Sequence, residues 1–271
     1  AAIAAPMAMT ALTGPHALPD GLVAVTTSRI AYRMAGDFSS DGRPAPAPLR
    51  DIRFAEPLRI MRQQVTAGEY ARCVAERACP PPAMPQSAPD LPVVGVNWQD
   101  ATAYADWISA RTGVLHRLPT DEEWSRAAAE RAPDEAPPLV DPADPAQAWI
   151  ARYEEEADRA RSSDAVPRPV GSFGVNSNGL ADLAGNVWEW TSTCFTRISL
   201  ATDGSSTVTN RNCGVRVIEG AHRAYLTDFI RDPRSGGCAF GAPPANIGFR
   251  LVVDGRPTAS PRLVAARIAG R

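Results

Sequence analysis

The sequence has little net charge and no long apolar run. Its 28 basic and 30 acidic residues give a net charge of −2, which provides no electrostatic footprint for DNA, RNA or an anionic membrane. No stretch approaches the roughly 18 to 20 unbroken apolar residues that a membrane helix needs. We therefore predict neither a nucleic-acid partner nor membrane insertion. Apolar residues make up 44% of the 271 positions, enough to fill one large domain.

Several catalytic patterns are also missing. The sequence contains no GxSxG, HExxH or GxGxxG motif and no phosphate-binding glycine-rich loop. Hydrolase, metalloprotease and nucleotide-dependent activities therefore have no support. It contains no CxxC pair and no Cys/His cluster with zinc spacing, which argues against a zinc site.

Cysteine is scarce and its count is odd. Five cysteines allow at most two disulfides and leave one thiol over. Cys73 and Cys79 flank a short segment at the end of a predicted helix and are candidates for one bridge. Cys194, Cys213 and Cys238 remain for the second bridge, and the sequence alone does not choose among them.

The first residues suggest export. The chain starts at Ala1 with a run of small residues up to Ala5, as expected after a signal-peptidase cut at an A-x-A-like site. Together with the cysteine usage, this favours a periplasmic or secreted protein whose signal peptide has been removed. The alternative is trimmed vector sequence.

One domain is expected between two loose ends. Residues 1–21 are interpreted as an entry segment, 22–256 as the domain and 257–271 as an Arg-rich tail. Alternation of apolar and polar residues predicts strands over Leu22–Tyr32 and Phe54–Arg62.

Helix starts are predicted from capping signals. A polar side chain at the cap accepts from the first turn, and an acidic residue three positions on can reach back to it. The caps are Thr66 with Glu69, Asn97 or Asp100, and Thr120 with Glu123. From Pro169 onward short strands alternate with Gly/Asn turns, which predicts a loop-rich α+β fold.

Three tracts occur in an order that is specific when they are taken together. The first is Pro92–Trp98 with Ala101–Trp107 and Arg117–Trp124, the second is Asn178–Trp190, and the third is Arg216–Gly220, closed by Ile247–Arg250. With the earlier Gln64–Tyr70, the sequence resembles the formylglycine-generating-enzyme (sulfatase-modifying factor) superfamily over most of its length. That resemblance implies a single-domain, loop-rich variant of the C-type-lectin-like architecture.

Glu189 is the residue of the second tract with the most demanding chemistry. In Val187–Trp190 an extended backbone points Val187 and Glu189 to one side and the two Trp rings to the other. A carboxylate buried among aromatic rings is costly unless it is paired or binds a metal. The matching tract in the family holds a structural calcium ion. The resemblance implies calcium ligands at Glu189 and at the backbone of Ala184, Gly185 and Val187.

Arginine provides the alternative to calcium. Arg216 or Arg250 could pair with Glu189 in the core. Arg250 is either such a structural partner or a substrate clamp, and Arg117 offers the same choice. Arg234 and Arg250 are the candidate substrate-binding residues.

The family's oxidising centre is missing from the expected segment. Family enzymes that convert a substrate cysteine to formylglycine bind copper(I) with two thiolates after an Arg-Val-x-x-Gly strand, and soft thiolates select copper(I). Residues 221–234 contain no cysteine. Aligned on Gly220, His222 takes the place of a serine and Tyr225 that of the first copper-binding cysteine, while Trp190 matches the tryptophan lining the oxygen pocket. Formylglycine formation by the copper mechanism is therefore not expected.

The same segment offers a polar set of its own. The candidate catalytic residues are His222, Tyr225, Asp228 and Arg231, together with Trp190. Three interpretations stay open: a redox metal, iron or copper; a metal-free polar cleft that binds substrate; and an inert structural loop.

A Cys194–Cys213 bridge would brace the wall of this cleft. The alternative pairs one of these residues with Cys238. A free Cys238 would lie close in sequence to the cleft segment, as either a reactive or a buried inert thiol.

Three functions follow from these observations. The first is an exported oxidative modification or maturation factor that acts on a peptide or protein substrate without the usual copper–cysteine centre. The second is a non-catalytic accessory or binding protein on the lectin-like scaffold, for example in metalloenzyme assembly. The third, sulfatase activation by the copper mechanism, is disfavoured by the missing cysteines. The sequence leaves the oligomeric state open.

Overall fold

The computed structural model describes residues 21–133, 150, 166–233 and 246–257. Arg234 and Cys238, and nearly all of both predicted end segments, lie outside the described residues. The helices of the described chain are α1 (Ala67–Ala75), α2 (Trp98–Thr112) and α3 (Asp121–Ala128), with a 3-10 turn at Ala129–Arg131.

Strands from distant parts of the sequence form three sheets. Their bounds are β1 Leu22–Val25, β2 Arg29–Arg33, β3 Asp37–Ser40, β4 Arg43–Pro44, β5 Leu49–Arg53, β6 Leu58–Met61, β7 Val114–Arg117, β8 Trp188–Leu200, β9 Ser206–Glu219, β10 Ala224–Thr227, β11 Ile247–Gly248 and β12 Val252–Pro257. One sheet has the order β1–β6–β12–β7, so strands from both ends of the domain share it. The largest has the order β10–β9–β8–β3–β4, with β11 parallel to β8, and β2 pairs with β5.

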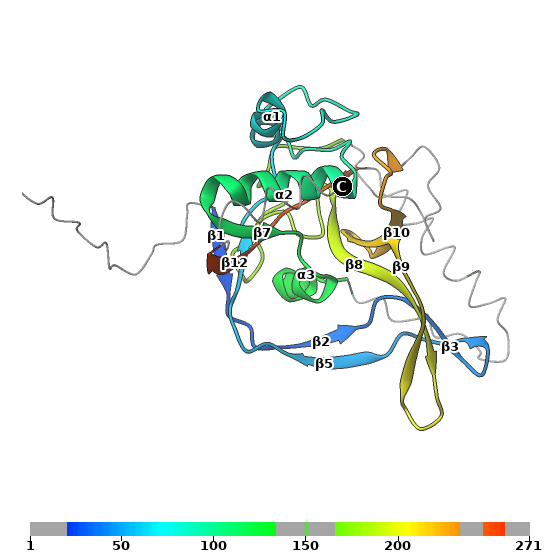
Figure 1. Ribbon diagram of the computed structural model, residues 1–271. Coiled ribbons are helices and arrows are strands. Elements are labelled where there is room, and N and C mark those ends of the chain that lie inside the picture. The colour runs from blue at the N-terminus through cyan, green and yellow to red at the C-terminus, as the bar shows by residue number, and fades with distance from the viewer. Residues whose placement is uncertain (1–20, 134–149, 151–165, 234–245, 258–271) are drawn as a thin grey trace, which may run out of the picture.

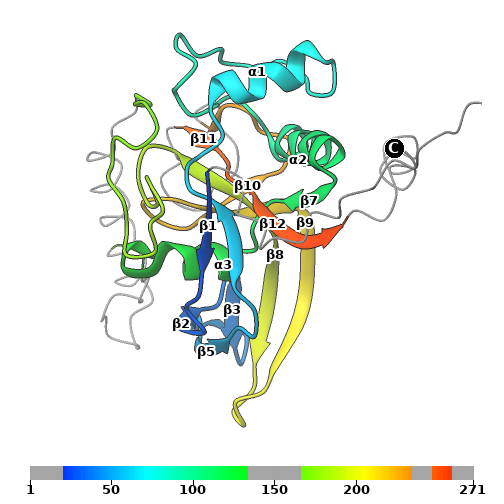
Figure 2. The same ribbon diagram turned by 90° about the vertical axis from the view of Figure 1, so that its left-hand side faces the viewer.

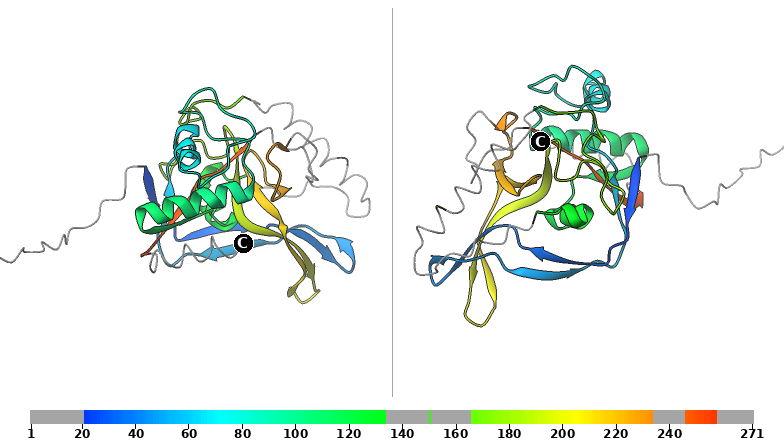
Figure 3. Two further views of the ribbon diagram at one scale, coloured as in Figure 1. Left: turned by 45° about the horizontal axis from the view of Figure 1, so that its top comes forward. Right: turned by 180° about the vertical axis from the view of Figure 1, so that it is seen from behind.

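The helices and the small sheet lie on opposite sides of the domain. In Figure 1, α1 and α2 are at one side, β2 and β5 are at the other, and α3 lies between them. The view from behind in Figure 3 shows the same order. Strands β8 and β9 continue beyond this body as a hairpin whose far end projects from it (Figure 2).

All three predicted helix starts are confirmed. Each N-cap side chain accepts from the backbone N–H three residues on, whose acidic side chain reaches back to the cap. The pairs are Thr66–Glu69, Asn97–Asp100 and Thr120–Glu123. Asp100, the alternative cap of the second helix, occupies the third helical position instead.

The strand predictions are corrected in three places. Leu22–Tyr32 is not one strand, because it divides into β1 and β2, which belong to different sheets. Phe54–Arg62 contains only β6, which starts after Pro57, a residue without the N–H that a sheet ladder needs. The strands beyond Pro169 are not all short, since β8 and β9 have 13 and 14 residues.

Two clusters of buried apolar residues fill the domain. One gathers Trp188 and Trp190 with residues of α1, α2 and β10, and the other packs Trp124 of α3 against β1 and β6. Apolar burial at this scale is the main term that offsets the conformational entropy of a loop-rich chain. The arrangement confirms the predicted single α+β domain.

Both predicted disulfides are present. Cys73–Cys79 closes the end of α1, and Cys194–Cys213 joins β8 to β9. The open choice among three cysteines for the second bridge is thereby decided. Within the described ranges, no helix is long and apolar enough to cross a membrane.

Candidate functional site

Glu189 of β8 lies at the centre of a buried hydrogen-bond network. Its carboxylate is 1% exposed, and Oε2 accepts from Arg250 Nε at 2.7 Å and from Trp124 Nε1 at 2.9 Å. The other oxygen, Oε1, accepts from Arg250 Nη2 at 2.7 Å and from Gln64 Nε2 at 2.9 Å. A buried carboxylate requires such compensation, here by a bidentate guanidinium and two neutral donors.

Arg250 is the partner of Glu189, and Arg216 is not. The other N–H groups of Arg250 donate to the carbonyls of Arg62 at 3.2 Å and Ala181 at 2.9 Å. Arg250 is fully buried, so it has no surface with which to contact a substrate. Its assignment to substrate binding is corrected accordingly: Arg250 is a structural ion-pair partner.

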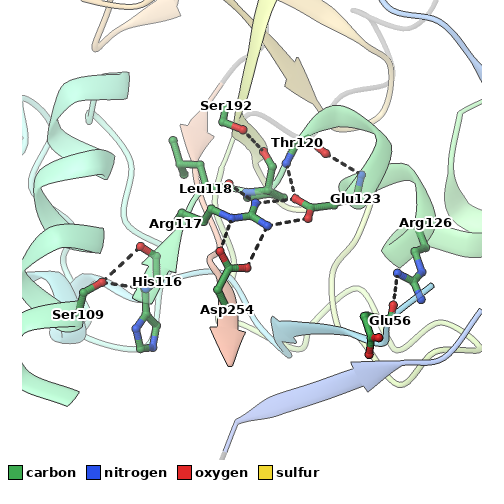
Figure 4. Close-up of polar contacts among 11 residues, drawn as sticks. Glu56, Ser109, His116, Arg117, Leu118, Thr120, Glu123, Arg126, Ser192 and Asp254 are labelled. Atoms are coloured by element: carbon green, nitrogen blue, oxygen red, sulfur yellow. Dashed lines mark hydrogen bonds and ion pairs between the residues drawn. The ribbon is translucent and has the colours of Figure 1, made fainter. Parts of the chain in front are cut away.

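Arg117 has a similar structural role at the start of α3 (Figure 4). Its Nη1 and Nη2 each donate to a Glu123 oxygen at 2.7 Å, and Nε and Nη2 donate to Asp254 at 3.2 and 3.1 Å. The hydrogen bonds to Glu123 raise the pKa of the Arg117 guanidinium, although burial opposes its charge. Because Glu123 also completes the N-terminal cap of α3, Arg117 fixes that helix to β7 and β12.

The backbone oxygens expected to bind calcium surround Gln64. Gln64 Nε2 lies 3.3 Å from the carbonyls of Gly185 and Val187 and 2.9 Å from Glu189 Oε1. An amide nitrogen carries two hydrogens and cannot satisfy three acceptors well. Its own Oε1 is buried and has no hydrogen-bond partner. Ala184, also expected as a ligand, lies in the preceding turn with a left-handed φ of 56°.

These residues fit a hard cation. The oxygen and nitrogen of a glutamine amide are nearly indistinguishable in shape, so the Gln64 amide can occupy the same space turned over. Its Oε1 would then join the oxygens of Gly185, Val187 and Glu189, which is the all-oxygen ligand type that calcium takes. A calcium ion held there would link the turn before β8 to the core.

The candidate active segment, residues 221–231, follows Gly220 and contacts Trp188, one of the two buried tryptophans of β8. Trp190 is fully buried, and its Nε1 donates to Val96 O at 3.0 Å. Trp188 Nε1 donates to the carbonyl of His222 at 3.1 Å, and the two rings meet edge to face at 5.3 Å. His222 is only 5% exposed. Gly220 faces the Trp188 ring so closely that a Cβ would lie 2.6 Å from it, which explains the glycine.

Tyr225 of β10 is held by the turn before β3. Its hydroxyl oxygen accepts from the N–H of Gly36 at 2.8 Å, and its ring meets that of Phe195 edge to face at 5.2 Å. The phenol therefore joins β10 and the distant β3 turn.

Asp228 and Arg231 connect the end of the segment to α2. The Asp228 carbonyl accepts from the N–H of Trp98 at 2.9 Å. Arg231 donates to both carboxylate oxygens of Asp100 at 2.7 and 2.8 Å, and these hydrogen bonds raise its pKa. The structure thus places the predicted polar residues along one segment and gives each a different neighbour.

Sequence reasoning missed a buried charge cluster at Arg223. Its Nη2 lies 3.0 Å from Asp121 and its Nε 2.7 Å from Glu219, and the Tyr32 hydroxyl donates to the same Asp121 carboxylate. Burial opposes the charge of Arg223, but the two carboxylates hold its pKa well above the usual value. No spacing rule could have found this cluster, because β2, α3 and the segment meet only in the fold.

A redox metal near His222 was one of the three open interpretations of this segment. Within the part of the chain that the structure describes, no three His, Cys, Asp or Glu side chains are grouped to hold a metal ion. Arg234 and Cys238 lie outside that part, so their predicted roles stay predictions.

Comparison with known proteins gives the family. A family model described as "Sulfatase-modifying factor enzyme 1-like domain" matches residues 13–255. The chain belongs to this family.

Its relatives include members with and without a stated activity. The formylglycine-generating enzyme of Streptomyces coelicolor is 32% identical over 177 residues, which cover 61% of this chain and 54% of the relative. The Mus musculus protein named inactive C-alpha-formylglycine-generating enzyme 2 is 37% identical over 183 residues, which cover 62% and 51%. The chain spans about half the length of these curated relatives. Family membership alone therefore does not decide whether it is an enzyme.

A solved structure supports the fold. PvdO from Pseudomonas aeruginosa aligns with a TM-score of 0.53 at 23% identity, over 86% of this chain and 94% of that one. At that identity the likeness concerns the architecture of the sulfatase-modifying-factor domain and not its chemistry.

An exposed aromatic residue lies near the end of the candidate active segment. Phe229, in the turn after β10, is 65% exposed. Its carbonyl accepts from Asn97 Nδ2 at 3.3 Å, which holds this turn against the first turn of α2, where Trp98 is half-buried. Sequence reasoning passed over Phe229 because it singled out the polar members of the segment.

Proposed function

We propose that this chain is a peptide- or protein-binding member of the sulfatase-modifying-factor family that contacts its ligand with the surface around Trp98 and Phe229. One contrast carries the proposal. Tyr225, at the position of the family's first copper-binding cysteine, is hydrogen-bonded to Gly36, whereas Phe229, four residues later, is 65% exposed. Exposed aromatic side chains supply contact area at low entropic cost and dominate binding hot spots.

The test uses a library of random peptides displayed on phage and selected on the full chain. Selected peptides are then measured against Phe229→Ser and against Leu49→Ser, which removes another exposed apolar side chain on the distant β5. We expect Phe229→Ser to weaken binding by about tenfold or more, as for an interface anchor, and Leu49→Ser to leave it unchanged. Selection of no peptide, or equal loss in both variants, would reject the proposal.

A second candidate is oxidative maturation of a peptide or protein without the copper–cysteine centre. It is supported by the relatives named formylglycine-generating enzyme. It requires iron or copper held near His222, and elemental analysis of the purified protein tests it. Near-stoichiometric iron or copper that is lost in His222→Ala would favour this candidate over binding alone.

We propose a structural calcium ion at Gln64, Gly185, Val187 and Glu189 as part of the same scaffold. Arg250 already balances the only carboxylate of the site, so we expect affinity in the weak range of extracellular modules, about 10⁻⁴ to 10⁻³ M. Thermal unfolding with 10 mM calcium or magnesium chloride tests it. We expect calcium to add about 1.5 kcal/mol or more of stability, and Gln64→Leu to abolish that increment. No difference between the two cations would contradict the site.

Export is proposed on the disulfides. Cys73–Cys79 and Cys194–Cys213 both form, and structural disulfides persist in oxidising compartments such as the periplasm. Reduction of both bridges in protein isolated from its native host would contradict export.

A further inference from the structure

The Cys194–Cys213 disulfide lies where the β8–β9 hairpin leaves the body of the domain. Its two halves have unequal access to solvent. Cys194 is 5% exposed and packs against the core, whereas Cys213 belongs to the exposed outer part of β9. We therefore expect an incoming thiol to approach Cys213 more readily than Cys194.

Arg216 is positioned against the buried sulfur. Its Nη1 lies 3.2 Å from Cys194 Sγ and 2.9 Å from the carbonyl of Ser192. Its guanidinium carbon lies 3.9 Å from the centre of the Trp98 ring, and its Nε is buried with no hydrogen-bond acceptor. These contacts are a sulfur, a carbonyl and an aromatic ring, and none is a carboxylate. Arg216 is thus a half-buried cation whose hydrogen bonds reach no anion.

A thiolate at Cys194 would supply that anion. Burial lowers the pKa of Arg216, even though Asp228 acts in the other direction, so a nearby negative charge relieves an existing cost. Nearby guanidinium groups depress thiol pKa values, and a thiol of lower pKa leaves a disulfide faster. The same contact therefore stabilises Cys194 as the leaving group.

We propose that Cys194–Cys213 is a thiol–disulfide exchange site for a small thiol or for a cysteine of a peptide or protein. The external thiolate attacks Cys213 Sγ and forms a new S–S bond with it. The Cys194–Cys213 bond breaks, and its electron pair remains on Cys194 Sγ as a thiolate beside Arg216. No proton moves, because the attacking thiol enters deprotonated. A second external thiolate then attacks the external sulfur of this mixed disulfide. Cys213 leaves as a thiolate, and the two external thiols depart joined as a disulfide. The external thiols are thereby oxidised and the bridge is reduced.

The other bridge of the chain provides an internal control. Cys73 and Cys79 are both buried. In the described structure, no guanidinium hydrogen-bonds to either of their sulfurs. This bridge therefore has neither an accessible sulfur nor a stabilised leaving group, and it should exchange slowly.

The experiment treats the folded full chain with reduced glutathione, blocks free thiols with iodoacetamide at intervals and maps both bridges by mass spectrometry. We expect glutathione on Cys213 and the carbamidomethyl group on Cys194, with Cys194–Cys213 opening at least about tenfold faster than Cys73–Cys79. Glutathione on Cys194, or equal rates of opening for the two bridges, would overturn the proposal. This test needs only the wild-type protein.

Variants separate the cation contact from simple exposure. Arg216→Leu should slow the opening of Cys194–Cys213 by about tenfold, since it raises the pKa of the leaving thiol. Arg197→Leu removes an exposed charge from β8, three residues after Cys194, and should leave the rate unchanged. An equal effect of both substitutions on the rate would contradict the proposed role of Arg216. The outcome is independent of peptide binding at Phe229, because glutathione is the only reactant.

Discussion

The charged core at Glu189 and the end of the segment, from Asp228 to Arg231, handle charge differently. In the core, Glu189 and Arg250 neutralise each other with almost no exposed surface. In the segment, Arg231 keeps 36% of its side chain exposed while it pairs with Asp100. The residues that carry the family resemblance therefore include those that hold the scaffold together.

Removal of the core cation is the most severe test of this comparison. Arg250→Met leaves the Glu189 carboxylate buried with only neutral donors, and we expect a loss of about 3–5 kcal/mol in the free energy of unfolding. Urea denaturation measures it. A double variant, Glu189→Gln with Arg250→Met, should recover a large part of the loss because it removes the uncompensated charge. A loss below about 1 kcal/mol in the single variant would show that the ion pair does not hold the core.

Gly220 lies at the joint between the two regions. A Cβ at this position would lie 2.6 Å from the rigid Trp188 ring, so Gly220→Ala should cost about 1–3 kcal/mol by overpacking. Gly214→Ala, within β9 and six residues before Gly220, is the matched control, since its Cβ would approach only the Asn212 side chain, at 3.3 Å. Thermal unfolding compares the two. Equal melting temperatures would mean that the segment can shift away from Trp188 at no cost, and that the two regions are not rigidly joined.

Local signals in the sequence were sufficient for the helix starts. Thr66 and Thr120 lie three residues before a glutamate, and both capping boxes form because every partner lies within one helical turn. The Glu189–Arg250 pair was also within reach, because burial of a carboxylate among aromatic rings leaves few ways to compensate it. The sequence still left two arginines open, and only the fold distinguished them.

Contacts between residues far apart in the sequence could not be predicted from the sequence. Tyr32 and Asp121 are 89 positions apart, and nothing in the sequence connects them to Arg223. The polar set at His222 was grouped because its members are close in sequence. In the structure, only Tyr225 lies in β10, whereas His222 precedes that strand and Asp228 and Arg231 follow it. Residues that are close in sequence therefore contact different parts of the domain.

The pair at the end of the segment, in which Arg231 is 36% exposed and Asp100 4%, should show the smallest effect. Arg231→Met removes the cation from Asp100, but Asp100 still accepts from the N–H of Asn97 as part of the helix cap. We therefore expect a loss below about 1 kcal/mol in urea denaturation, similar to that of Arg111→Met, which breaks the exposed pair with Glu76. A loss as large as that of Arg250→Met would place Arg231 in the structural core and remove the distinction between the two regions. A small loss combined with weaker binding of the selected peptides would instead assign Arg231 to the same surface as Phe229, because only a ligand contact could then explain its effect.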